Sequence, residues 1–319
     1  MSGETLIQVE NLYRDYGSLH ALIDINLTLN RGEVLGFLGP NGAGKSTTMQ
    51  IISGNLAPTS GQVRINGFDI IDEPRQAKAA LGFLPEQPPL YHELTVNEYL
   101  EYCVKLNRIP GPSAASAVNK ACDRCGLGDV RKRLIGNLSK GYQQRVGIAQ
   151  AIIHTPEVVI LDEPTVGLDP IQIREIRDLI RELGNDHSVI LSTHILPEVQ
   201  STCDRVIIIN KGKIALEDSL AGLDSRLQQN GFIVSLANPP ESEQLAALNG
   251  INQYEQLGAG RYLLDCDKEF NPAEFSSTAV NNNWQLTELA PQTGSLEQVF
   301  IDITCSDNHT NEAPGGAGS

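Results

Sequence analysis

Residues 39–47 read Gly-Pro-Asn-Gly-Ala-Gly-Lys-Ser-Thr, and this stretch decides how the rest of the chain is interpreted. It satisfies the pattern G-x-x-x-x-G-K-[ST], in which glycines let the backbone turn tightly and point several N–H groups at one anion. An apolar, strand-like run (GEVLGFL) leads into it, and a helical pattern (STTMQIISG) overlaps its end and follows it. Because a helix N-terminus favours negative charge, this order of elements predicts a phosphate-binding loop.

The loop predicts a role for each of its residues. Lys45 is expected to reach the β- and γ-phosphates of ATP, Ser46 to ligate Mg²⁺, and Thr47 to reach the α-phosphate. The rest of the loop is expected to surround the phosphates with its backbone, and it comprises Gly39, Pro40, Asn41, Gly42, Ala43 and Gly44. The sequence therefore predicts that the chain binds and hydrolyses ATP.

The composition limits the partners and the compartment. The chain has 319 residues, 40% of them hydrophobic, and a formal net charge of -15. That charge disfavours a nucleic-acid backbone as the main partner, which would need clustered lysine and arginine. No run approaches the roughly eighteen apolar residues of a membrane span, and the N-terminus lacks the basic start of a secretory signal. We therefore expect a cytoplasmic protein without a span of its own.

A pair of carboxylates follows an apolar run at 158–161. Asp162 and Glu163 would stand at the carboxyl edge of a parallel sheet, where ligands bind in open α/β folds. We expect Asp162 to help to hold Mg²⁺ and Glu163 to act as the base that polarises the attacking water. His194 follows the strand-like run at 189–192 and is expected to contact the γ-phosphate. Each feature alone is more often structural, but the upstream loop favours the catalytic interpretation of the carboxylates.

The pattern along the chain indicates two domains. Residues 1–220 alternate apolar strand-like runs with helical patterns, which is typical of an α/β domain with a largely parallel sheet. The predicted strands include 34–38, 158–161, 189–192 and 206–209. Its opening reads as antiparallel strands, and about 88–155 reads as a helical insertion. Residues 221–305 are acidic and read as strand, helix, two strands, helix, strand and a final helix, which predicts a small α+β domain of the ferredoxin-like βαββαβ kind. The predicted helices here are 241–248 and 272–280, and the last strand is predicted at 284–289. Residues 306–319 are expected to form a disordered tail.

Cys122 and Cys125 form a CxxC pair, which can mark a redox or zinc site. No second pair of cysteines or histidines stands at zinc-site spacing, and the local pattern is helical. We therefore expect two ordinary buried thiols.

The order of these motifs resembles the ATP-binding subunits of ABC transporters over nearly all of residues 5–220. The most specific element is LSKGYQQR at 138–145, which matches the signature motif of that family. The resemblance implies that Ser139 and Gly141 contact the γ-phosphate of ATP held on a second subunit. It also implies a fold of a phosphate-loop core, an antiparallel β-subdomain and a helical signature subdomain.

Two more positions carry over from the resemblance. Tyr16, in the string RDYG, matches the aromatic residue that stacks on adenine, although a strand aromatic packed on the core is the alternative. Asp169, in GLD at 167–169, matches the loop that crosses the dimer interface after the catalytic glutamate. The resemblance therefore predicts that Asp169 links the two sites.

The lid segment departs from the pattern of the family. The family places its lid glutamine directly after a proline, whereas residues 84–87 read Leu-Pro-Glu-Gln. Either Glu86 or Gln87 fits the role. Gln87 is favoured as a ligand of ATP and Mg²⁺, because a further carboxylate would add negative charge to an anionic site.

The signature LSKGYQQR and the strings LPEQPPLYHELTVNEYL and SLEQVFIDIT resemble type-2 ABC exporter ATPases of the gliding-motility and multidrug-export type. This resemblance implies a separate membrane permease that docks near Tyr91–Tyr102, attachment to the inner face of the cell membrane through it, and a head-to-tail dimer of two copies. An importer ATPase with a regulatory C-terminal domain and a soluble ABC ATPase acting on ribosomes or DNA are the alternatives.

Overall fold

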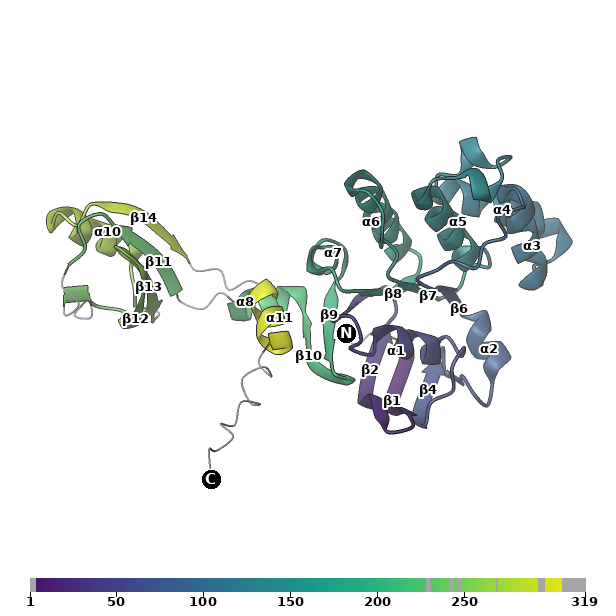
Figure 1. Ribbon diagram of the computed structural model, residues 1–319, viewed down its shortest axis with the longest axis horizontal. Coiled ribbons are helices and arrows are strands. Elements are labelled where there is room, and N and C mark those ends of the chain that lie inside the picture. Colours follow the sequence, from purple (N-terminus) through teal and green to yellow (C-terminus); the bar gives the residue numbers. More distant parts are fainter. Residues whose placement is uncertain are drawn as a thin grey trace, which may run out of the picture. The chain divides into compact units, whose positions relative to one another are not determined.

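The computed structural model describes residues 4–227, 231–240, 244–245, 248–267, 269–291 and 296–305. The chain divides into two compact units, Met1–Leu220 and Ala221–Ser319, each of which is described by itself (Figure 1). The predicted tail at 306–319 lies outside the described residues. None of the described helices is long and apolar enough to cross a membrane.

A six-stranded sheet forms the centre of the first unit, with the order β10-β9-β3-β8-β7-β6. Its strands are β3 (Val34–Leu38), β6 (Leu81–Leu84), β7 (Val158–Asp162), β8 (Ser188–Thr193), β9 (Arg205–Asn210) and β10 (Lys213–Ser219). All neighbours are parallel except β9 and β10. Strands β3, β7 and β8 are buried at every residue, as expected for a parallel sheet covered on both faces.

The two faces of this sheet are buried by different layers. Side chains alternate along a strand, so Val158 and Ile160 pack into one apolar cluster, and Val159 and Leu161 into another. The first cluster includes an antiparallel sheet of order β2-β1-β4-β5 and helix α1 (Lys45–Ile52). Its strands are β1 (Thr5–Tyr16), β2 (Leu19–Asn30), β4 (Ser60–Ile65) and β5 (Phe68–Asp69), and α2 (Pro74–Ala79) lies beside it. The predicted antiparallel subdomain is confirmed.

The other cluster contains the helical region, which gathers α3 (Val96–Leu106), α4 (Gly111–Arg124) and α5 (Lys140–Ile152) (Figure 1). Two short 3₁₀ helices, Gly128–Val130 and Ile135–Asn137, precede α5. The remaining helices of the core are α6 (Pro170–Gly184) and α7 (Leu196–Thr202), and α8 (Leu220–Leu227) follows β10. Cys122 and Cys125 are buried free thiols, and no cluster of potential metal ligands occurs in the described part of the chain.

The second unit contains the strands β11 (Gly231–Leu236), β12 (Ile251–Gly258), β13 (Arg261–Cys266) and β14 (Leu286–Pro291), with α10 (Pro272–Asn281) and α11 (Leu296–Cys305). The sheet is antiparallel with the order β12-β13-β11-β14, which is the predicted ferredoxin-like arrangement. Only Gln244 and Leu245 of the predicted helix 241–248 are described as helical.

The last strand begins later than predicted. The sequence pattern placed it at 284–289, but the backbone at Asn283 and Gln285 has positive φ angles of 54° and 53°. The N–H of Trp284 donates to the carbonyl of Ala279, so this residue is part of the turn that closes the C-terminal end of α10. The strand can start only after these turns, at Leu286.

Candidate nucleotide-binding and catalytic site

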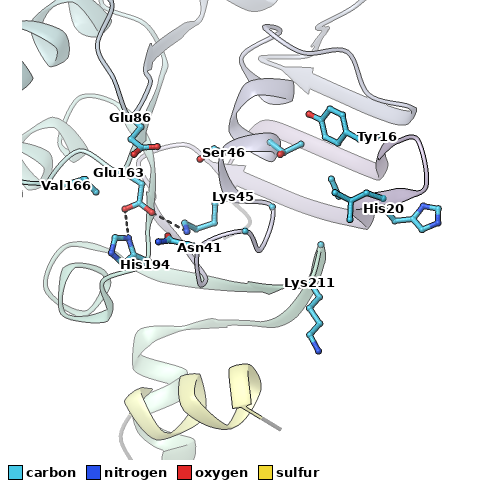
Figure 2. Close-up of a pocket in the computed structure, with 16 residues that line it drawn as sticks. Tyr16, His20, Asn41, Lys45, Ser46, Glu86, Glu163, Val166, His194 and Lys211 are labelled. Atoms are coloured by element: carbon cyan, nitrogen blue, oxygen red, sulfur yellow. Dashed lines mark hydrogen bonds and ion pairs between the residues drawn. The ribbon is translucent and has the colours of Figure 1, made fainter. Parts of the chain in front are cut away.

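The predicted phosphate loop lies between β3 and α1 and forms part of the wall of a cavity of about 710 Å³ (Figure 2). Gly44 immediately precedes α1 with a φ angle of 111°, and a Cβ there would come within 2.7 Å of the side chain of Leu22. Only glycine fits this position without strain. Of the predicted loop residues, the wall includes Asn41, Gly42, Gly44, Lys45, Ser46 and Thr47.

Lys45 is held inside the loop by contacts within the chain itself. Its Nζ donates to the carbonyl oxygens of Gly39 at 2.9 Å and Pro40 at 3.2 Å, and it lies 3.2 Å from Oε1 of Glu163. Both ionic side chains are almost fully buried, at 5% and 6% exposure. A phosphate in the loop would therefore compete with Glu163 for the ammonium group.

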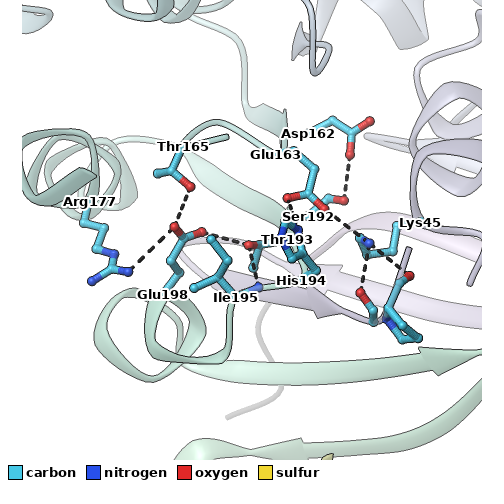
Figure 3. A network of polar contacts seen from close by, with 12 residues as sticks. Lys45, Asp162, Glu163, Thr165, Arg177, Ser192, Thr193, His194, Ile195 and Glu198 are labelled. Atoms are coloured by element: carbon cyan, nitrogen blue, oxygen red, sulfur yellow. Dashed lines mark hydrogen bonds and ion pairs between the residues drawn. The ribbon is translucent and has the colours of Figure 1, made fainter. Parts of the chain in front are cut away.

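The backbone turns sharply at Glu163, directly after β7. Its φ angle is 50°, an unusual left-handed conformation for a non-glycine residue, and its N–H donates to the carbonyl of Ser192 at 2.8 Å. The other carboxylate oxygen, Oε2, lies 2.8 Å from Nδ1 of His194. The structure thus brings Lys45, Glu163 and His194 together, as Figures 2 and 3 show.

Asp162 is the last residue of β7 and is 3% exposed. Burial raises the pKa of this carboxyl group, while hydrogen bonds from Ser192 and Ser46 act in the opposite direction. The Ser192 hydroxyl donates to Oδ1 at 2.7 Å. A hydroxyl and a carboxylate from Ser46 and Asp162 are thus neighbours, and such oxygen ligands suit Mg²⁺.

Tyr16 also lines the cavity and is 46% exposed. The guanidinium carbon of Arg14 lies 4.5 Å from the centre of its ring, in a cation–π contact. Arg14 in turn donates to the carbonyl of Ala57 at 3.1 Å. One face of the ring is therefore covered, and a base stacked on Tyr16 would use the other face.

The signature residues lie elsewhere on the chain. Ser139, Gly141 and Asp169 line a separate hollow of about 380 Å³, together with Arg145 and Gln172. Ser139 caps α5 by accepting from the N–H of Tyr142 at 3.4 Å, a long hydrogen bond. Asp169 caps α6 by accepting from the N–H groups of residues 171 and 172 at 3.0 and 2.9 Å. Among the described residues, none of the signature stretch 138–145 lines the phosphate cavity.

The lid segment contributes Glu86 to the wall of the phosphate cavity, whereas Gln87 is exposed outside it. The assignment of Gln87 as a ligand stays a prediction.

Sequence reasoning missed Glu198, a fully buried carboxylate on α7. It contacts the segments that carry Glu163 and His194 (Figure 3). The only hint in the sequence was an acidic residue close to Leu196, Val199 and Thr202, which are the other buried residues of that helix.

The fold and this site define a class of protein. A phosphate loop between a strand and a helix, with a carboxylate pair at the end of a neighbouring parallel strand, is the arrangement of a phosphate-loop nucleoside triphosphatase.

Comparison with known proteins identifies the family. Residues 22–166 match the family described as ABC transporter. The ABC transporter ATP-binding protein YdbJ of Bacillus subtilis is 36% identical over 312 residues, which cover 97% of this chain and 98% of YdbJ. The bacitracin transport ATP-binding protein BcrA of Bacillus licheniformis is 39% identical over 215 residues, which cover 67% of this chain and 69% of BcrA.

Comparison with solved structures also finds an ABC ATP-binding protein. The ATP-binding cassette MJ0796, in a dimeric post-hydrolysis state with ADP and phosphate, matches 67% of this chain and 99% of its own with a TM-score of 0.61 at 26% identity. The chain therefore belongs to the ABC transporter ATP-binding proteins, and it binds and hydrolyses ATP. Proteins of this family work as dimers and pair with membrane components. The predicted resemblance and fold class are confirmed.

Proposed function

We propose that two copies of this chain form a head-to-tail dimer that binds ATP with Mg²⁺ between them and drives export through a separate membrane permease. The observation that carries the dimer is the separation of the two half-sites. The phosphate cavity and the hollow around Ser139 and Gly141 have no lining residue in common among the described residues. A second copy in two-fold symmetry would supply its signature residues to the first and receive the same in return.

Within each half-site, Lys45 would exchange its partner when ATP binds. The phosphates would attract its ammonium group away from Glu163, and the freed carboxylate would then accept a proton from the attacking water. The water oxygen would bond to the γ-phosphorus as the bond to the bridging oxygen breaks, giving ADP and phosphate. Because Nδ1 of His194 faces Glu163, its Nε2 would be available to the γ-phosphate.

Ser46 and Asp162 would hold Mg²⁺, with the lid residue Gln87 as a third oxygen donor. The side chains of Ser46 and Asp162 are already neighbours, which supports their part of this assignment. When bound, the ion neutralises negative charge on the phosphates.

Three relatives support export. They are named bacitracin transport ATP-binding protein, linearmycin resistance ATP-binding protein and lantibiotic transport ATP-binding protein. The permease would dock near Tyr91 and Tyr102, which are 46% and 38% exposed and whose rings stack edge to face at 5.6 Å. Docking would hold the chain at the inner face of the membrane. Purification of the full chain from membranes should recover an integral protein, and recovery of soluble partners only would contradict this role.

The dimer and the catalytic base are tested with Glu163→Gln. We expect this variant to bind ATP, to lose turnover by about 100-fold or more, and to double its mass by light scattering when ATP is added. Glu163→Gln combined with Lys45→Ala is the control and should stay monomeric with ATP. A Glu163→Gln protein that hydrolyses ATP at the native rate would exclude Glu163 as the base, and one that stays monomeric with ATP bound would contradict the dimer.

A further inference from the structure

We propose that Glu198 is a positioning residue for hydrolysis, because it joins the segment after Glu163 to the segment before His194. This inference rests on the proposed catalytic function of Glu163. Glu198 itself is not among the described residues that line the phosphate cavity.

Both oxygens of the Glu198 carboxylate are used. Oε1 accepts a hydrogen bond from the hydroxyl of Thr165, and Oε2 accepts one from the hydroxyl of Thr193 at 2.8 Å. Nη2 of Arg177, on α6, lies 3.7 Å from Oε1 and balances the charge. The Glu198 side chain is 1% exposed, so water does not compete for these contacts (Figure 3).

The two hydroxyl donors lie beside the catalytic pair in sequence. Thr165 is two residues after Glu163, in the segment that leads to Asp169. Thr193 is the residue before His194, and its hydroxyl also accepts from the N–H of Ile195 at 3.0 Å. With one bond donated and one accepted, the Thr193 hydroxyl has a fixed direction. Glu198 therefore ties the segment after β7 to the end of β8, next to Glu163 and His194 in the chain.

A carboxylate suits this task better than an amide. Each of its oxygens can accept without donating, so both threonine hydroxyls are satisfied in one geometry. A glutamine would present one acceptor and one donor group, so that one of the threonine hydroxyls would have to turn. The shift would reach the contact between Glu163 and His194, where a displacement of about 1 Å can cost about 100-fold in rate.

The segment 165–169 also connects this network to the proposed second copy. Asp169 lies in the hollow with Ser139 and Gly141, while Thr165 is bonded to Glu198. A partner that moves this segment would move Thr165, and through Glu198 it would move Thr193 and His194. The network thus offers a route by which dimer closure sets the catalytic geometry.

The test compares Glu198→Gln and Thr165→Val with the matched control Thr165→Ser, which keeps the hydroxyl. Valine has nearly the shape of threonine, so we expect Thr165→Val to fold. The midpoints of urea unfolding check that all three variants are folded. We expect kcat for ATP to fall about 10- to 100-fold in the first two variants, with KM changed less than about twofold, and near-native values for Thr165→Ser.

A second readout does not depend on turnover. The imidazole NMR signals of His194, assigned by their loss in His194→Ala, should shift in Glu198→Gln and Thr165→Val and not in Thr165→Ser. Unchanged signals and kcat, or an equal loss in Thr165→Ser, would overturn the inference. If the His194 signals shift as expected but Glu163→Gln hydrolyses ATP at the native rate, the proposed role of Glu163 as the base is wrong, and the role of Glu198 in holding His194 stands.

Discussion

At the level of single residues, the ion pair between Lys45 and Glu163 links nucleotide binding to catalysis, because the ammonium that neutralises the carboxylate is also the group that a phosphate would bind. Both charges are buried, so removing one partner leaves the other in a poorly solvated place. Glu163 keeps a second partner in His194, which limits the cost.

Lys45→Ala should therefore have two measurable effects. ATP affinity should fall about 10- to 100-fold by fluorescence titration, since a charge-assisted hydrogen bond to the phosphates is lost. The free energy of unfolding without ATP should fall by about 1 to 3 kcal/mol, because the buried carboxylate loses a partner. The double variant Lys45→Ala, Glu163→Gln should recover part of this stability, and a double variant less stable than Lys45→Ala would contradict the pairing.

The buried thiol of Cys125 gives a prediction about pH. Burial raises the pKa of Cys125 to about 12 and holds the pKa of Cys122 above its usual range, so neither is a thiolate at pH 8. Iodoacetamide at pH 8 should leave both unmodified in the folded chain and alkylate both in urea, as measured by mass spectrometry of their peptides. Since the thiol pKa is higher in the folded chain, the stability contributed by Cys125 is complete below about pH 8.5 and is lost as the pH rises toward 12. Rapid alkylation of the native protein would contradict the buried, unreactive assignment.

Site residues could be predicted from the sequence where the residues that act together are consecutive in the chain. The loop that contains Lys45, and the pair Asp162 and Glu163 after an apolar run, fall in this class. Glu198 and Arg14 do not, because their partners are distant in sequence and only the tertiary structure brings them together. A buried acid on a short helix carries no local signal of which hydroxyls it meets.

At the level of elements, Asp169 has a structural role that must be separated from its predicted role between subunits. It caps α6, and an uncapped helix end leaves backbone N–H groups without partners. Asp169→Ala should lower the free energy of unfolding by about 0.5 to 2 kcal/mol, whereas Asp169→Asn should keep most of the stability because asparagine also caps helices. Urea denaturation without nucleotide measures both, and equal stability of the alanine variant would show that the cap contributes nothing.

The same pair of variants then tests the interface. If Asp169 links the two sites through its charge, Asp169→Asn should weaken the ATP-dependent dimer while leaving the fold intact. A native-like dimer in Asp169→Asn would restrict the residue to its capping role.

The elements of the core were predictable because of their burial. A strand covered on both faces needs consecutive apolar residues, which made β3, β7, β8 and β9 visible in the sequence. Helix α7 was not predicted, since it has only seven residues and begins two residues after His194. The start of β14 was also misplaced, because the left-handed backbone at Gln285 has no local signal, whereas Asn283 is of a residue type enriched in that conformation.

At the level of the whole molecule, the central proposal is that each ATP is shared between two copies of the chain. Ser139→Arg would disrupt the signature residues, which contact the ATP held on the second copy. Lys45→Ala would disrupt the phosphate loop, which binds the ATP held on the same copy. Each variant alone should be inactive, since every site that two of its copies could form carries one defect.

The most direct measurement mixes the two variants in equal amounts and follows ATP hydrolysis. Copies that meet at random form a mixed pair in about half of the encounters, and each mixed pair has one intact site, formed by Lys45 of one copy and Ser139 of the other. We expect about a quarter of the native rate, against almost none for either variant alone. No recovery on mixing, with dimers confirmed by light scattering, would contradict a site completed by the second copy.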